Sequence, residues 1–237
     1  MMSYMENSKV SIAIIGVGPK GLYTYLRILE QARHHPNILY IINLVEPNII
    51  GCGFAYDPSQ PDFLLMNNCN HHLDYSQLLI EVGLDDAMDY QQFVEVNNLV
   101  AFDNFDEGFS PRCVVGAYLR YLYDEGRNHA PGNVTTAIHR KVATSIIPQN
   151  IQYTIMLDDN SQLCVDKICL TTGHGILNQA IHDPRSSSRM VYPVNSQVVD
   201  AKLSQKTIRC VGFGLTFIDF FLSATEGRGG RFDLTKM

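Results

Sequence analysis

The chain has 237 residues and a formal net charge of −6, and 46% of its residues are hydrophobic while 18% are charged. This composition is that of an ordinary globular protein, and without a basic stripe it argues against a nucleic-acid partner. The apolar run at residues 10–15 is too short for a signal-peptide core, and no run approaches the length of a membrane span. We therefore expect a cytoplasmic protein with neither nucleic acid nor membrane as partner.

Cysteine and histidine are spaced in ways that argue against metal and disulfide sites. The six cysteines form no C-x-x-C pair, which in a chain of this size indicates reduced, mostly buried thiols. His71 and His72 are adjacent and His139 stands alone, so none has a partner at ligand spacing. No metal site is expected.

The N-terminal region predicts a strand, a glycine turn and a helix. Residues 10–15 form an apolar, β-branched run typical of a buried parallel strand. The turn at residues 16–21 follows, and leucines and tyrosines then recur at helical spacing over residues 19–33. Pro19 fits the first helical turn, because its missing N–H would be unpaired there in any case.

The glycine turn has the pattern of a dinucleotide-binding site. Gly16 allows a tight turn, Gly18 lets a pyrophosphate approach the backbone, and Gly21 lets the helix pack on the strand. Unpaired N–H groups and the helix dipole favour an anion at a helix N-terminus. We therefore expect the whole turn, with Pro19 and Lys20 in it, to bind the pyrophosphate.

Glu46 ends the second predicted strand, residues 38–45, and follows Gly16 by thirty residues. A carboxylate at this position can accept hydrogen bonds from both ribose hydroxyls. The interval exceeds the usual ~20 residues because the helix is long and residues 34–37 add a break. With no Arg or Lys beside it, the acid disfavours a 2′-phosphate. The alternative is a solvated glutamate that merely follows a strand.

Further elements are predicted after Glu46. Helices are expected at residues 86–97 and 114–125, and short β segments at residues 134–147, 151–157 and 163–170. A strand at residues 207–211, a turn containing Gly212 and Gly214, and an apolar helix to about Thr225 repeat the strand–glycine–helix order. Phe217 occupies the position of the third glycine, so this unit is either a second nucleotide site or simply a packed βα unit.

Six pieces of sequence carry a resemblance to a known family. In chain order they are Ile14-Ile-Gly-Val-Gly-Pro-Lys-Gly21, Gly51-x-Gly-x-Ala-Tyr56, Leu65-Met-Asn67, Pro111-Arg112 with Gly116-x-Tyr-Leu119, Leu170-Thr-Thr-Gly-His174, and Gly212-x-Gly-Leu-Thr216 with Asp219. Their order resembles a bacterial FAD/NAD(P)-binding family that includes flavin-dependent urate hydroxylases and aspartate N-monooxygenases. The resemblance implies an α/β, Rossmann-like fold of the two-dinucleotide-binding flavoprotein type, with a β-meander insert.

The resemblance also implies a cofactor and its contacts. FAD is the expected cofactor, with Gly51, Gly53 and Asn67 near the flavin and the turn of Thr172 and Gly173 closing over the cofactor. The alternative is that residues 51–57 are only a turn-rich connection. The resemblance further implies that Gly212 and Gly214 bind NAD(P)H. Arg112, at an expected helix start, could meet a phosphate or an anionic substrate, or be a surface charge.

The expected organisation is one FAD/NAD(P)-binding domain over residues 1–237. Its FAD part covers about residues 8–176, and an incomplete second nucleotide unit begins at about residue 205, because members of the resembled family continue further. The implied function is an FAD-binding oxidoreductase, in its most specific form an NAD(P)H-dependent flavin monooxygenase acting on a small polar metabolite. The alternative is a cofactor-binding module without turnover. No side chain is assigned as a catalytic acid or base.

Overall fold

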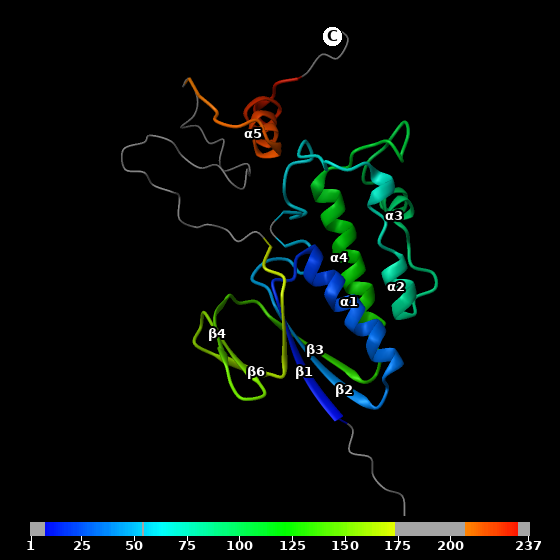
Figure 1. The fold of residues 1–237 in the computed structure, drawn as a ribbon. Coiled ribbons are helices and arrows are strands. Elements are labelled where there is room, and N and C mark those ends of the chain that lie inside the picture. Colours follow the sequence, from blue (N-terminus) through cyan, green and yellow to red (C-terminus); the bar gives the residue numbers. More distant parts are fainter. Residues whose placement is uncertain (1–7, 54, 174–206, 232–237) are drawn as a thin grey trace, which may run out of the picture.

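A four-stranded parallel sheet forms the centre of the computed structural model, which describes residues 8–53, 55–173 and 207–231 (Figure 1). Its strand order is β3-β2-β1-β7, with β1 at Ser8–Ile15, β2 at Ile38–Val45, β3 at Val134–His139 and β7 at Lys167–Leu170. The last four residues of both β1 and β2 are buried, while their first residues are more exposed. The carboxyl ends of β1 and β2 are therefore covered by other parts of the molecule. In parallel α/β sheets this edge carries the ligand site.

Helices cover one face of this sheet. The long helices are α1, Pro19–His34, and α4, Arg112–Asn128, which lie side by side in Figure 1. The short helices are α2, Gln77–Val82, and α3, Tyr90–Val96, with the 3₁₀ turn η1 at Asn70–His72. Tyr25 and Tyr123 join α1 to α4 in the core with ring centroids 5.8 Å apart, and both are fully buried. Burial of such side chains is the main stabilising contribution of this layer.

An antiparallel meander covers the opposite face. Its strands are β4, Ala143–Pro148, β5, Tyr153–Leu157, and β6, Gln162–Val165, in the order β4-β5-β6. Ala13, Ile15 and Val45 of the parallel sheet pack on the meander, whereas Ile14 and Leu44 belong to the core beneath the helices. This alternation follows from the two-residue period of a strand, and it explains why the apolar runs of β1 and β2 are continuous.

The β-rich insert was predicted, but two of its boundaries were wrong. Residues 134–147 form two strands of different sheets, since β3 pairs parallel with β2 while β4 pairs with β5. Residues 163–170 also divide, at Asp166, whose backbone and side chain both bond to the backbone of Ser11. Continuous apolar patterns cannot reveal where a chain passes from one sheet to the next.

The helix expected at residues 86–97 begins later than predicted, at Tyr90. Asp89 and Gln92 form a capping box at its start, and such reciprocal bonds fix a helix N-terminus. The helix expected at residues 114–125 extends over Arg112–Asn128. The short helix α2 was not predicted.

The late strand expected at residues 207–211 is absent from the structure. These residues have no regular secondary structure, and Val211 is 92% exposed. A strand needs a neighbour that accepts its backbone hydrogen bonds, and no strand among the described residues pairs with this segment. The helix after it, α5, is present at Leu215–Thr225 and is followed by the 3₁₀ turn η3, Glu226–Arg228. His174 and residues 232–237, which were part of the expected units, lie outside the described ranges.

All six cysteines are free, as predicted. The expectation that most are buried was wrong, because only Cys52 is buried whereas Cys164 and Cys210 are exposed. Cys164 lies on β6 at the outer side of the meander, where alternate side chains face away from the core. Among the helices that the structure describes, none combines the length and the apolar character needed to cross a membrane.

Candidate functional site

The first glycine turn lies at the carboxyl edge of the parallel sheet, between β1 and α1. Gly16 has φ +84°, and a Cβ there would lie 2.8 Å from the carbonyl oxygen of Thr171. A Cβ on Gly21 would lie 2.3 Å from the carbonyl oxygen of Gly16. Both positions therefore need glycine, the first for its backbone conformation and both for close packing.

Helix α1 begins with its N–H groups available to a ligand. Gly18 is the N-cap, Pro19 occupies the first turn, and no side chain caps the helix. Leu22 donates its backbone N–H to the carbonyl of Gly18 at 2.8 Å. The first-turn N–H groups before Leu22 have no partner within the helix, and together with the helix dipole they favour an anion.

Glu46 is buried beside this turn, directly after β2. One carboxylate oxygen accepts the backbone N–H of Val17 at 2.7 Å, and the other accepts the N–H of Asn48 at 2.9 Å. Glu46 is 5% exposed, so the alternative of a solvated glutamate is wrong. The carboxylate holds the glycine turn against the end of β2, and each of its oxygens keeps a second lone pair for a further hydrogen bond.

The loop at residues 51–53 packs against the first turn, backbone to backbone. Gly51 donates its N–H to the carbonyl of Val17 at 2.7 Å, and a Cβ on Gly53 would lie 3.0 Å from the Cα of Gly18. Gly51 and Gly53 have φ of +88° and +55°. Both positions therefore require glycine by geometry, while their predicted contact with the flavin stays a prediction.

Helix α4 packs against the loop at residues 51–53. The thiol of Cys52 donates to the carbonyl of Gly116 at 3.1 Å, and a Cβ on Gly116 would lie 1.9 Å from the carbonyl oxygen of Tyr56. The glycine at position 116 thus lets the loop lie directly on the helix. The sequence marked Gly116 only as part of a family pattern, whereas the structure gives it this packing role.

Substitution of Gly116 tests the docking of loop and helix. A Cβ 1.9 Å from a backbone oxygen forces the loop away, and overpacking of this kind costs about 3 kcal/mol. We expect Gly116→Ala to lower the free energy of unfolding by that amount in urea titrations. Gly132→Ala is the control, since a Cβ there meets nothing within 4 Å. Equal stability of the two variants would show that the loop does not rest on α4.

The Cys52 thiol gives a second test of this packing. Burial raises its pKa to about 12, so almost no reactive thiolate exists at pH 8. We expect a maleimide at pH 8 to label the exposed Cys164 and Cys210 first, and Cys52 only after unfolding in urea. Mass spectrometry of tryptic peptides would locate the label, and early labelling of Cys52 would contradict the docked loop.

A third segment, residues 171–173, completes the site. Thr171 donates its N–H to the carbonyl of Ile15 at 2.9 Å, and its hydroxyl donates to the carbonyl of Gly16. Thr172 is exposed, and its Cα would lie 2.8 Å from a Cβ on Gly16. Gly173 has φ +70° with nothing near its Cβ position. Sequence reasoning missed Thr171, because two adjacent threonines do not reveal which of them bonds to the turn.

Lys20 belongs to the first glycine turn and is exposed in the first turn of α1. The other predicted residues lie apart from this junction. Asn67 is exposed and makes no hydrogen bond to any described residue. Gly212 and Gly214 are exposed, and nothing lies within 4 Å of their Cβ positions. The second turn therefore lacks the tight packing of the first.

The second turn nevertheless has the local backbone shape of the first. Gly212 has φ +102° where Gly16 has +84°. Gly214 is the N-cap of α5 with φ −87° and ψ −175°, while Gly18 is the N-cap of α1 with φ −73° and ψ −163°. Each turn thus opens an uncapped helix, which is the feature that binds phosphate.

Arg112 has a protein partner. Its guanidinium donates to both carboxylate oxygens of Asp219, at 2.7 and 2.9 Å. The sequence alternatives for Arg112 were an anionic ligand or a surface charge, and the pairing with Asp219 was not predicted. The two residues are 107 positions apart, and sequence spacing carries no signal for such a contact.

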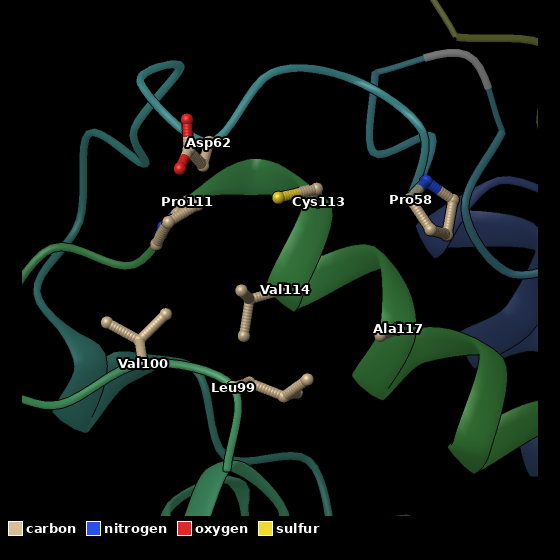
Figure 2. Close-up of a pocket in the computed structure, with 8 residues that line it drawn as sticks. All are labelled: Pro58, Asp62, Leu99, Val100, Pro111, Cys113, Val114 and Ala117. Carbon is tan, nitrogen blue, oxygen red and sulfur yellow. The ribbon is translucent and has the colours of Figure 1, made fainter. Parts of the chain in front are cut away.

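A pocket of about 500 Å³ lies beside the first turns of α4. Figure 2 shows Leu99 and Val100 on one side of it and Asp62 on the other, with Cys113 and Val114 on the helix. Its lining is mainly apolar. No group of three His, Cys, Asp or Glu side chains suited to a metal ion occurs here or elsewhere in the described ranges.

These features define a class of protein. A parallel sheet whose first βαβ unit has an uncapped glycine turn and a buried acid at the end of its second strand is a dinucleotide-binding fold. The FAD-NAD(P)-binding family model matches residues 13–175. The chain belongs to this family, and its Rossmann-like FAD/NAD(P)-binding fold is the one predicted from the sequence.

Curated relatives of the chain are nitrosuccinate-forming enzymes. An L-aspartate N-monooxygenase of Streptomyces davaonensis is 24% identical over 96% of this chain and 40% of the relative. A nitrosuccinic acid synthase of Aspergillus oryzae is 23% identical over 94% of this chain and 36% of the relative. The chain thus spans about two fifths of the length of the relatives it matches.

Two similar solved structures are monooxygenases. A flavin-containing monooxygenase from Stenotrophomonas maltophilia has 14% identity and a TM-score of 0.42, covering 70% of this chain and 38% of that one. A cyclohexanone monooxygenase has 12% identity and a TM-score of 0.43, covering 70% and 27%.

Proposed function

We propose that FAD binds where residues 16–21, 51–53 and 171–173 meet, and that the chain is the flavin-binding part of an NAD(P)H-dependent monooxygenase. The observation that carries this proposal is the junction itself. Three segments that are distant in sequence approach one another through glycine backbones at the carboxyl edge of β1, β2 and β7. This is where an open parallel sheet binds its nucleotide.

The residues of the junction fit the chemistry of FAD. The turn of Gly16, Gly18 and Gly21, with Pro19 and Lys20, would hold the pyrophosphate on the first-turn N–H groups of α1. Glu46 would accept the ribose hydroxyls with the lone pairs that Val17 and Asn48 leave free. When bound, the flavin supplies the redox chemistry, and the protein supplies its position and electrostatic surroundings.

The flavin end of the cofactor would lie along the two later segments. Gly51 and Gly53 permit close approach of the backbone, and Thr172 and Gly173 would close over the cofactor. Asn67 would meet the flavin edge through its amide, which has no partner among the described residues. In this proposal the FAD part covers about residues 8–176.

The second glycine turn would serve NAD(P)H. Its backbone shape, which repeats that of the first turn, supports this role for Gly212 and Gly214. In this proposal it belongs to a second nucleotide-binding unit that begins at about residue 205.

The substrate class follows from the relatives and not from the site. Two curated relatives are named for nitrosuccinate formation, one of them as an L-aspartate N-monooxygenase, so we propose a small polar metabolite and would test aspartate first. The apolar lining of the pocket beside α4 does not suit such a substrate.

Six free cysteines support a cytoplasmic location.

A second candidate is a module that binds FAD without turnover, and the exposure of residues 207–214 favours it. One experiment separates the two. The purified chain is inspected for flavin absorbance, and NADH or NADPH is then added without oxygen. Bound flavin that bleaches supports the oxidoreductase, whereas flavin that stays oxidised supports the module. A colourless protein that takes up no FAD would overturn both.

A further inference from the structure

Helix α5, together with the turn η3 that follows it, is attached to the other described residues by polar and glycine contacts, not by an apolar core. Ser223 is its only buried residue, while Leu215 and Ile218 are about half exposed, at 52% and 49%. A helix of a globular protein ordinarily docks through an apolar stripe. The position of α5 must therefore depend on the few specific contacts that it makes.

The strongest of these contacts is the pair of Arg112 and Asp219. Two parallel bonds of 2.7 and 2.9 Å join the guanidinium to the carboxylate, and the two side chains are 21% and 14% exposed. Bidentate geometry and partial burial make such a pair stronger and more specific in direction than a surface ion pair.

Arg112 is itself held in place before it reaches α5. Its Nε donates to the carbonyl of Leu65 at 3.1 Å, and its backbone N–H donates to the carbonyl of Leu64 at 2.8 Å. The same strip contacts η3, because a Cβ on Gly227 would lie 3.0 Å from the ring of Phe63. One fixed surface therefore contacts α5 and the turn η3 after it, and this surface consists of residues 63–65 and Arg112.

Asp219 lies five residues after Gly214, the N-cap of α5. This places it about 7.5 Å along the helix axis from the second glycine turn. A contact that fixes Asp219 therefore also fixes the turn. α4, which provides Arg112, supports the loop of Gly51 and Gly53 through Gly116, so one helix links both glycine sites.

We propose that Arg112 and Asp219 are positioning residues that set the second glycine turn, and any nicotinamide dinucleotide on it, relative to the FAD site. This inference rests on the proposed function of Gly212 and Gly214. Neither side chain contacts the nucleotide in this proposal. Their effect on it passes through the position of α5.

The test compares Arg112→Asp, Asp219→Asn and the exchanged pair Arg112→Asp/Asp219→Arg with the unchanged chain. We expect amide hydrogen exchange over residues 215–225 to accelerate about tenfold in each single variant, because the helix loses its main anchor. NADP⁺ and NAD⁺ affinity, measured by calorimetry on the FAD-loaded protein, should fall by a similar factor. The exchanged pair should recover both, while FAD affinity stays unchanged throughout.

Arg120→Asp is the matched control, because it makes the same charge reversal in a more exposed ion pair within α4. It should change neither exchange in α5 nor nucleotide affinity. Asp219→Asn keeps the side-chain shape on a helix that buries only Ser223, so the test survives if Arg112→Asp does not fold. Unchanged exchange in Asp219→Asn would overturn the inference, as would faster exchange with unaltered nucleotide affinity.

The outcomes also separate this inference from the proposed function. A chain that takes up no FAD would refute the proposed function, while exchange in α5 would still report on the pair. A chain that takes up FAD but binds neither NADP⁺ nor NAD⁺ would overturn the positioning role and leave the FAD site standing.

Discussion

Gly18→Val is expected to abolish FAD uptake while leaving a folded protein. Gly18 has an ordinary φ of −73°, and a Cβ there would lie 3.6 Å from the Cα of Gly53, which is normal van der Waals contact. The fold can therefore accept a side chain at this position. The branched side chain would, however, fill the space in front of the first-turn N–H groups of α1, where the pyrophosphate must approach the backbone.

We expect the Kd for FAD to rise at least about 100-fold, which corresponds to about 2.7 kcal/mol. Quenching of flavin fluorescence on titration would measure it. The free energy of unfolding without cofactor should change by no more than about 1 kcal/mol, because loss of a glycine also restricts the unfolded chain. Circular dichroism in urea would establish this second value.

Two other glycine variants show whether the effect is specific. Gly21→Ala places a Cβ 2.3 Å from the carbonyl oxygen of Gly16, so it should lose both stability and FAD binding. Gly132→Ala meets nothing within 4 Å and should lose neither. If Gly18→Val bound FAD with undiminished affinity, the pyrophosphate would lie elsewhere and the central assignment would be wrong.

The extent to which the sequence predicts this site depends on how local each interaction is. The turn from Gly16 to Gly21 is read directly, because its glycines, its helix start and its strand are contiguous. The loop of Gly51 and Gly53 was predicted through the family pattern, and its docking on Gly116 only became visible in three dimensions. The pair of Arg112 and Asp219 could not be predicted, since opposite charges distant in sequence have many equivalent partners.

The two glycine turns also show that the sequence predicts local conformation better than long-range pairing. Gly212 and Gly214 have the local conformation that the sequence predicts. The strand expected before them is missing, because a strand depends on neighbours and not on its own composition. An apolar segment such as residues 207–211 indicates what the chain can form in a suitable sheet. Whether that sheet exists is a property of the surrounding structure.

Glu46→Gln is expected to weaken both the fold and the FAD site. The carboxylate accepts the N–H groups of Val17 and Asn48 with different oxygens. Glutamine keeps one acceptor oxygen and presents an NH₂ group to the other N–H, so one of the two donors loses its partner. Leaving a buried donor unpaired costs about 1–3 kcal/mol, which should appear as a lower free energy of unfolding in the cofactor-free protein.

FAD affinity should fall about tenfold in the same variant, because one ribose hydroxyl loses a charged acceptor and the glycine turn loses a support. Glu95→Gln is the control, since Glu95 is exposed and its carboxylate accepts a hydrogen bond from Gln91, one turn earlier in α3. The two measurements distinguish the structural role of the carboxylate from its role in binding the ribose. A loss of stability with unchanged FAD affinity would make Glu46 a structural clamp alone. A loss of affinity with unchanged stability would make it a ribose ligand whose bonds to Val17 and Asn48 are dispensable, and only the combined loss supports the dual role that the geometry indicates.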